Sequence, residues 1–185
     1  MAIVHDTTLV PSKLELLTEW LPRQPWYVGS GTLDLARAGG FRLDDPAGEV
    51  GIEVMVVTDI AGSEVVSYLV PLTYRGAPLP GGEAALVGTS EHGVLGKRFF
   101  YDAPADPVFR AELRALVRGQ TQAQAQRESD TPDPTVLVGA VPDAADVEVV
   151  RVLVASDAVP APGEVAVPWQ LPDGHRVRGV VARAS

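Results

Sequence analysis

The stretches VGIEVMVVT, residues 50–58, and VVSYLVPLTY, residues 65–74, decide the fold of this protein. Both are rich in β-branched and other apolar residues, and a break at Ala61, Gly62 and Ser63 separates them. This composition is typical of neighbouring strands that a turn connects. We therefore expect these two segments to form an antiparallel strand pair.

Further strands are expected on both sides of this pair. Four short apolar or β-branched segments follow a polar stretch late in the chain, and the sequence Pro-Asp-Gly at 172–174 is a good turn between the last two. Glycines around Gly29, Gly31, Gly39 and Gly40 indicate a loop. The expected additional strands are residues 2–10, 84–87, 98–101, 135–138, 147–154, 165–171 and 176–182.

Two amphipathic helices are indicated by their end signals. Ser12 and Glu15 have the spacing of a capping box, and Pro22 is expected to end the helix that they begin. A second helix is expected to begin at Asp106, which precedes a proline, and to end near Gly119. Together with the strands, these helices predict an α+β protein in which antiparallel sheet dominates.

The chain divides into three expected parts. Residues 120–134 are rich in Gln, Ser, Asp and Pro and are typical of a linker or exposed loop. Residues 1–119 then form an α+β domain, and residues 135–185 form a β-rich C-terminal extension. The sequence leaves open whether this extension is a second domain or adds to the first sheet.

Composition excludes several classes of function. The formal net charge of −9 disfavours a nucleic-acid partner, because phosphate recognition needs clustered positive charge. The chain has no cysteine, so disulfides and thiolate metal sites are excluded. No apolar run reaches the roughly 18 residues that span a membrane, and the N-terminus lacks the pattern of a secretory signal. We expect a cytoplasmic protein with no membrane partner.

Six segments carry a recognisable pattern, in order and without large gaps: residues 9–13, 17–27, 40–46, 71–79, 89–96 and 130–134. Together they resemble the opening of actinobacterial maltokinases. The likeness covers roughly residues 2–135, and the blocks are specific as a set. In that family the N-terminal cap is a cystatin-like layer, a curved antiparallel sheet with a helix packed on it.

The resemblance implies a fold and a metabolic neighbourhood, from trehalose through maltose to glucan, but no kinase activity. A kinase body needs a few hundred further residues with a catalytic Asp, an acidic ligand for magnesium and a phosphate-covering loop. About 50 residues follow the matched region, and they are typical of strands. His5-Asp6 is no catalytic loop, since no Asn follows at the required distance. We therefore expect no enzyme activity and no cofactor.

Local patterns give no complete catalytic or metal site. The segment at 93–98 departs from a phosphate-binding loop, because Arg98 stands where Ser or Thr is required. His92 follows Ser90 and Glu91, but three consecutive residues rarely converge as a catalytic triad, and a hydrogen-bonded turn His is the simpler interpretation. The pairs Asp44-Asp45 and Asp130/Asp133 fit turns better than a calcium loop.

Four residues remain as candidate contacts with a ligand or partner: Trp26, Tyr27, His92 and Arg98. Trp20, Trp26 and Tyr27 form an aromatic cluster in which Trp20 is expected to be core. The other two aromatic residues either pack on the sheet or offer a surface to a ligand or partner, because sugars stack on exposed aromatic rings.

The sequence thus supports two functional hypotheses. The first is a non-catalytic interaction or regulatory protein of trehalose, maltose and glucan metabolism, whose partner is a sugar kinase, a maltokinase, a trehalose synthase or a second copy. The second is a small-molecule binding protein for a sugar or sugar phosphate, or a minor enzyme of the same pathway. A pocket that gathers Asp44, Asp45, His92 and Arg98 would favour the enzyme, and dispersed side chains would count against it.

Overall fold

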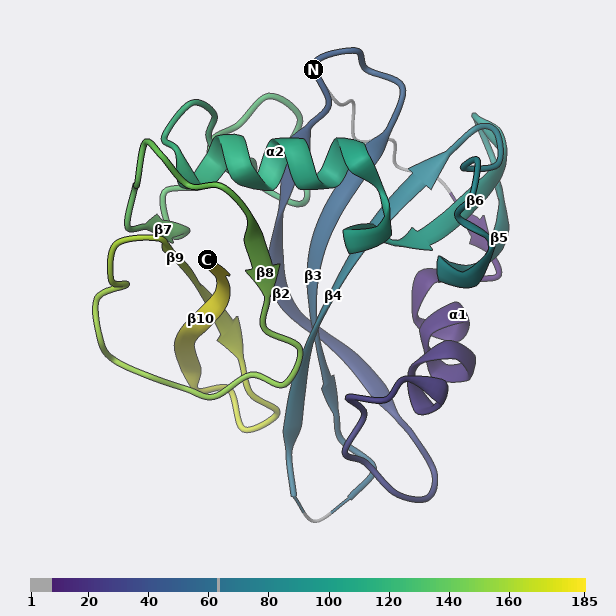
Figure 1. The fold of residues 1–185 in the computed structure, drawn as a ribbon. Helices are drawn as coiled ribbons and strands as arrows, with labels where there is room; N and C mark the ends of the chain where they lie inside the picture. The colour runs from purple at the N-terminus through teal and green to yellow at the C-terminus, as the bar shows by residue number, and fades with distance from the viewer. Residues whose placement is uncertain (1–7, 63) are drawn as a thin grey trace.

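The computed structural model describes residues 8–62 and 64–185 and shows a mainly antiparallel protein with few helices (Figure 1). The expected α+β class with a curved sheet is confirmed. The helices are α1 (Lys13–Trp20) and α2 (Pro107–Val117), with short 3₁₀ turns at Leu21–Arg23, Glu83–Ala85 and Ala103–Ala105. The strands are β1 (Leu9–Val10), β2 (Leu35–Asp44), β3 (Gly51–Asp59), β4 (Val66–Arg75), β5 (Leu86–His92), β6 (Gly96–Asp102), β7 (Leu137–Val138), β8 (Val147–Val149), β9 (Glu164–Gln170) and β10 (Arg176–Ala184).

The sheet curves until its last strand returns to its middle. Its order is β1-β5-β6-β4-β3-β2-β9-β10-β8, with β7 paired to β9. Directly after β8, Val152 bridges Tyr68 of β4, where Leu69 N donates to Arg151 O at 2.9 Å. The strands of residues 135–185 therefore belong to the same sheet as β2–β4, while the division of the chain into residues 1–119, 120–134 and 135–185 stays a prediction.

The expected strand pair at residues 50–58 and 65–74 is confirmed as β3 and β4, which pair from Gly51↔Tyr74 to Asp59↔Val66. Both helices also begin where the sequence predicted. The Ser12 side chain and the Glu15 side chain form the capping box of α1, and α1 ends at Trp20, two residues before Pro22. Asp106 caps α2, and Gly119 follows its end with a φ of 69°.

The loop expected around Gly39 and Gly40 is wrong, because both glycines lie inside β2. The glycines are there for close packing rather than for a turn. A Cβ on Gly39 would lie 2.8 Å from Pro168 O of β9, and the chain bulges between Arg37 and Gly39. Gly40 has a φ of 126°, a conformation that favours glycine. Gly29 and Gly31 do lie in the expected loop.

Other strand boundaries also differ from the prediction. Residues 83–85 are a 3₁₀ turn, and the strand that follows runs through the segment at 88–92 that was expected to separate two strands. Of the strand expected at 147–154, Val147–Val149 is present as β8. The backbone after Val149 is irregular and makes an isolated bridge at Val152. Of the opening strand expected at 2–10, Leu9–Val10 is present and residues 2–7 lie outside the described residues.

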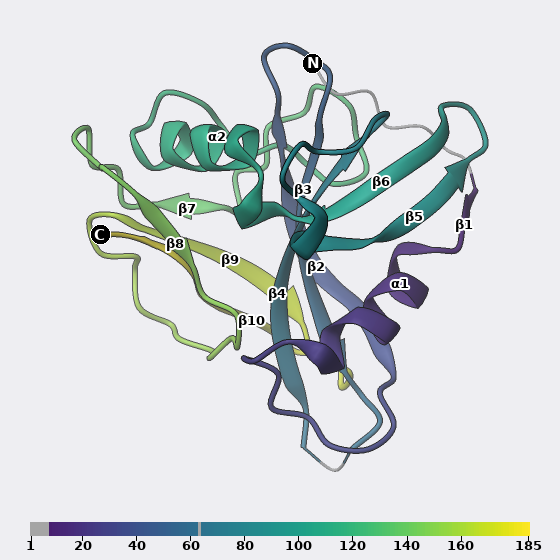
Figure 2. The ribbon, with the colours of Figure 1, turned by 45° about the vertical axis from the view of Figure 1, so that its right-hand side comes forward.

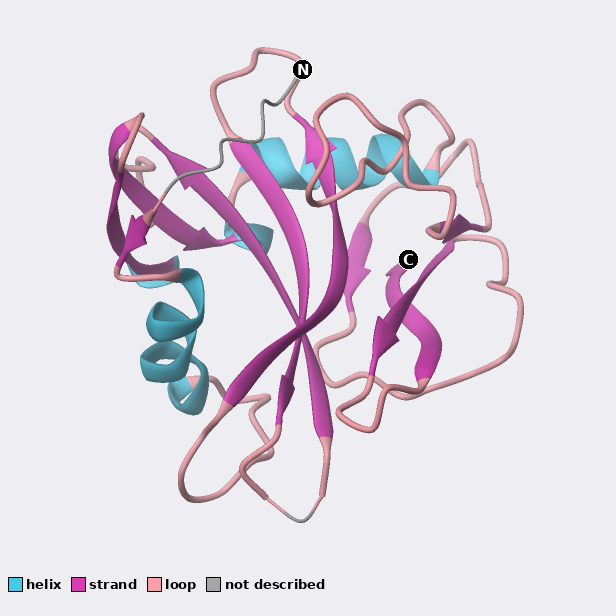
Figure 3. Cartoon of the chain, turned by 180° about the vertical axis from the view of Figure 1, so that it is seen from behind, coloured by secondary structure: helices cyan, strands magenta, loops and turns pink. Residues whose placement is uncertain are grey.

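The curved sheet separates two apolar cores. The α2 core lies between β2–β4, α2 and the C-terminal strands, and the α1 core lies on the opposite face of β2–β4 under α1 (Figures 1 and 3). Alternation along β3 sends Ile52, Val54 and Val56 into the α2 core, and Met55 and Val57 into the α1 core. Each face of these strands is therefore buried against a different set of elements.

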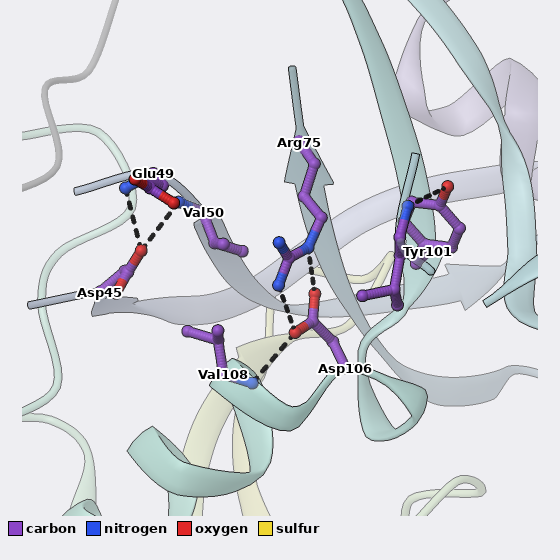
Figure 4. Close-up of polar contacts among 8 residues, drawn as sticks. Asp45, Glu49, Val50, Arg75, Tyr101, Asp106 and Val108 are labelled. Carbon is purple, nitrogen blue, oxygen red and sulfur yellow. Dashed lines mark hydrogen bonds and ion pairs between the residues drawn. The ribbon is translucent and has the colours of Figure 1, made fainter. Parts of the chain in front are cut away.

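An ion pair fixes α2 to the sheet (Figure 4). Arg75 of β4 donates to both carboxylate oxygens of Asp106 at 2.8 and 2.7 Å, and Asp106 also accepts from Val108 N at 3.0 Å. Burial by itself would raise the pKa of the Asp106 carboxyl, but its hydrogen bonds to Arg75 and Val108 lower that pKa below its ordinary value. One buried carboxylate thus caps the helix and ties it to β4.

Candidate functional site

The main polar site of the α1 face is built around Glu53. This carboxylate points from β3 to the same face as Met55, and the residue is 3% exposed. It pairs with Lys13 of α1 and with Arg37 Nη2 of β2 at 2.8 Å, and it accepts from Gln126 Nε2 at 3.1 Å. Four separate segments therefore meet at one carboxylate.

The neighbouring charges determine the ionisation of Glu53. Burial by itself would raise the pKa of the Glu53 carboxyl, but the positive charges of Lys13 and Arg37 outweigh this and lower it below its ordinary value. Burial raises the pKa of the neighbouring Tyr74 hydroxyl, and the Glu53 charge raises it further. The site therefore holds a carboxylate and a protonated phenol at neutral pH.

A polar pocket of about 320 Å³ adjoins this site. It lies between the first half of β2 and the segment after α2, because Gln124 pairs with Arg42 of β2 through hydrogen bonds of 2.8 and 2.9 Å. The segment predicted as a linker or exposed loop thus packs along the edge of β2. The pocket is lined by Arg37, Ala38, Gly39, Gly40, Ala125, Gln126, Arg127, Glu128, Asp133 and Gln170.

Trp26 and Tyr27 pack on the sheet and stay partly exposed. The ring of Trp26 lies 5.9 Å from that of Trp20, and the Arg151 guanidinium lies 4.7 Å from the Trp26 ring centroid. Tyr27 stacks on Tyr68 of β4 at 5.7 Å. Trp20 is 7% exposed, as expected for a core residue.

His92 and Arg98 lie in the β5–β6 hairpin, which extends from the body of the protein with β1 on its outer edge (Figure 2). His92 Nδ1 accepts from Val94 N at 3.2 Å and from Leu95 N at 3.0 Å, so this histidine stabilises the turn. Arg98 donates to Lys97 O at 3.2 Å. Both residues are half-buried.

The structure does not bring the four predicted contact residues together. Tyr68, on which Tyr27 stacks, lies seven residues along β4 from Arg75, which pairs with the neighbour of Arg98. At about 3.4 Å per residue this is a separation of roughly 24 Å. The four residues therefore belong to two different surfaces.

The residues considered for an enzyme site are dispersed as well. Asp45 accepts from the backbone N–H groups of Ala47, Glu49 and Val50 at 2.9–3.0 Å, so it holds the β2–β3 turn (Figure 4). Asp44 is three strand spacings from β6, roughly 14 Å. Within residues 8–62 and 64–185, no group of three or more His, Cys, Asp or Glu side chains is placed to hold a metal ion.

The Glu53 site was missed from the sequence, although one signal was present. Glu53 is the one charged residue in the apolar run at 50–58, and a charge in the middle of a buried strand requires partners. Those partners lie 40, 16 and 73 residues away, in Lys13, Arg37 and Gln126. Sequence spacing could not identify them.

Comparison with known proteins finds one family match, in the N-terminal part of the chain. No curated protein matches the sequence. In the part of the chain that the structure describes, no helix is both long and apolar enough to cross a membrane. The family model of the maltokinase N-terminal cap domain matches residues 20–106, a segment that runs from Trp20 to Asp106 and includes β2–β6, and no kinase domain family is detected. Residues 20–106 are therefore similar to the maltokinase N-terminal cap domain.

Proposed function

We propose that this protein is a non-catalytic interaction or regulatory protein of trehalose, maltose and glucan metabolism, and that it acts in the cytoplasm. The match of residues 20–106 to the maltokinase N-terminal cap domain is the observation that carries this proposal. The cystatin-like character of the layer formed by β2–β6 and α1 is part of the same proposal. The catalytic chemistry of the pathway would reside in the partner.

The aromatic end of the molecule is the proposed contact surface. We define it as Trp26 and Tyr27 with three exposed aliphatic residues: Val28, which follows them in the chain, and Ile60 and Val65, which lie in the β3–β4 connection. Ile60 N donates to Asp34 O at 2.8 Å, and this bond holds the loop that follows Tyr27 against the end of β3. All five residues lie within the matched segment.

Three properties of the aromatic end fit a protein partner. Val28, Ile60 and Val65 are 61%, 40% and 49% exposed, so apolar side chains gather here at the surface. Trp and Tyr residues carry much of the binding energy at protein interfaces. Trp26 and Tyr27 are also held rigidly by ring contacts, which lowers the entropy lost on binding.

The proposed partner is a sugar kinase, a maltokinase or a trehalose synthase. The test is affinity purification of the tagged protein from its native cells, followed by mass spectrometry. We expect stoichiometric recovery of one of these enzymes, and we expect Val28→Glu or Val65→Glu to abolish it. The matched control is Val159→Glu, since Val159 is 83% exposed and lies outside the aromatic end.

Two results would overturn the proposal. Recovery of the protein by itself, as a monomer or as a homo-oligomer, would exclude a hetero-partner. Equal loss of the partner with Val28→Glu and Val159→Glu would show that the aromatic end is not the contact surface.

A further inference from the structure

The polar pocket beside Glu53 is separate from the proposed partner surface, and the family match assigns it no ligand. Its volume of about 320 Å³ falls at the lower end of the roughly 300–1,000 Å³ typical of small-molecule sites. Its walls come from β2, within the matched segment, and from residues 125–128, Asp133 and Gln170, beyond it. It therefore exists only where the two parts of the chain pack together.

The donors and acceptors of the pocket are held in place before any ligand binds. Gln126 Nε2 donates to Glu53 Oε1, and Arg37 Nη2 donates to the same oxygen. The missing side chain of Gly40 leaves room for Gln126, because a Cβ there would lie 2.9 Å from Gln126 Nε2. The backbone pairing of Gln124 with Arg42 fixes the loop on β2. Such preorganisation is what a selective polar site requires.

Two exposed side chains of the pocket have unused hydrogen-bonding capacity. Among the described residues, neither the Arg127 guanidinium nor the Glu128 carboxylate has a hydrogen bond or ion pair, although both lie in the lining. Arg37 uses one of its nitrogens on Glu53 and has further N–H groups to donate. The pocket thus offers free donors and a free acceptor side by side.

The balance of charge selects the ligand class. The lining holds two cations, Arg37 and Arg127, and two anions, Glu128 and Asp133. Because these opposite charges offset each other, the lining gives a phosphate or carboxylate ligand no net electrostatic attraction. An apolar ligand would meet no large apolar side chain, since Ala38 and Ala125 are the apolar side chains of the lining. A hydroxyl group both donates and accepts, so several hydroxyls match this mixture.

We propose that this pocket binds a neutral saccharide. This saccharide site does not depend on the proposed partner. The sequence left open a protein that binds a sugar or sugar phosphate, and the pocket is the proposed site for the neutral sugar. Arg127 and Glu128 bind hydroxyl groups at the rim, and Gln126 and the backbone at Gly39 and Gly40 form the floor.

The experiment is a titration of the ¹⁵N-labelled full chain with glucose, galactose, maltose and trehalose, followed by NMR. We expect at least one of them to shift the amide signals of Gly39, Gly40, Ala125 and Gln126. Arg127→Ala should weaken that binding about tenfold, as for a lost hydrogen bond to a charged group. The control is Arg110→Ala, since Arg110 is exposed on α2 and outside the pocket.

The alternative outcomes separate the possibilities. No shifts with any of the four sugars, or an unchanged affinity in Arg127→Ala, would overturn the site. Binding of inorganic phosphate at the same amides with higher affinity than the sugars would overturn the neutral class. Recovery of the partner enzyme should be the same for Arg127→Ala and wild type, so failure here is distinct from failure of the proposed partner binding.

Discussion

The two faces of β2–β4 are built from the same strands but differ in chemistry. On the α2 face, alternate residues such as Phe41, Leu43 and Leu69 form a continuous apolar core, and the buried charge of Asp106 lies at its border where α2 begins. On the α1 face, the apolar part around Met55 gives way to the Glu53 site within one strand. The difference follows from what covers each face.

The α2 face is covered by an 11-residue helix and by the C-terminal strands, which exclude water from it. The α1 face is covered by the eight-residue α1 and by loops, so Lys13 and Arg37 keep 19% and 32% of their side chains exposed. Charged groups are tolerated at partly hydrated positions and are costly in a dry core. Both proposed binding sites accordingly involve the less fully covered side of the sheet and its edges.

The largest effect should come from opening a cavity in the α2 face. Phe41→Ala removes a fully buried ring, and we expect the free energy of unfolding to fall by about 4 kcal/mol. Urea denaturation followed by circular dichroism measures this. Val159→Ala is the control and should change stability by less than about 0.5 kcal/mol. A loss below about 1 kcal/mol for Phe41→Ala would contradict a closely packed α2 core.

Removing the buried ion pair at the border of this core should have the next largest effect. Asp106→Ala loses both the pairing with Arg75 and the cap of α2, and we expect a loss of about 3 kcal/mol. Arg75 is partly exposed and can be hydrated again, which limits the loss. Asp106→Asn, which keeps a capping oxygen, should lose less in the same denaturation experiment, and equal losses would show that the charge contributes nothing.

A smaller effect is expected at the charged site of the α1 face. Glu53→Gln removes the charge that Lys13 and Arg37 share, and we expect a loss of about 2 kcal/mol at pH 7, measured by urea denaturation against the control Glu49→Gln. Because the folded-state pKa of Glu53 lies below its ordinary value of 4.5, its stabilisation is present above that value and is lost as pH falls through the folded pKa. The difference from wild type should therefore shrink below about pH 4. A difference that stays constant down to pH 3 would contradict the lowered pKa.

The smallest effect should come from the cap of α1. Ser12→Ala breaks the capping box with Glu15, and we expect a loss of about 1 kcal/mol by thermal or urea denaturation. Ser12→Asp, which retains a capping oxygen, should be close to wild type. If Ser12→Ala were as costly as Asp106→Ala, α1 would contribute as much to the fold as α2, and the contrast between the two faces would disappear.

Local signals explain why some elements were predictable. Ser12 with Glu15 and Asp106 with its following proline satisfy backbone groups within a few residues, so both helix starts could be predicted. β3 and β4 were predictable because nearly every residue is apolar or β-branched. β2 was not predictable, because two adjacent glycines usually indicate a loop. The sequence does not show that β9 and Gln126 pack against Gly39 and Gly40.

The candidate site shows the same limit. The aromatic pair Trp26 and Tyr27 could be identified from the sequence, but its separation from His92 and Arg98 depends on strand order. The pocket depends on residues 120–134, predicted as a linker or exposed loop, in which Gln124 pairs with Arg42.

The sequence by itself determined the α+β class, the β3–β4 pair, both helix starts and the resemblance to a maltokinase cap. These depend on local backbone preferences, on alternation of side chains or on a run of characteristic residues. Only the tertiary structure decided the closure of the sheet at Val152, the partners of Glu53 and the pocket at Gly40. Each of these depends on contacts between residues far apart in the chain, which burial and hydrogen bonding select only once the whole sheet is assembled.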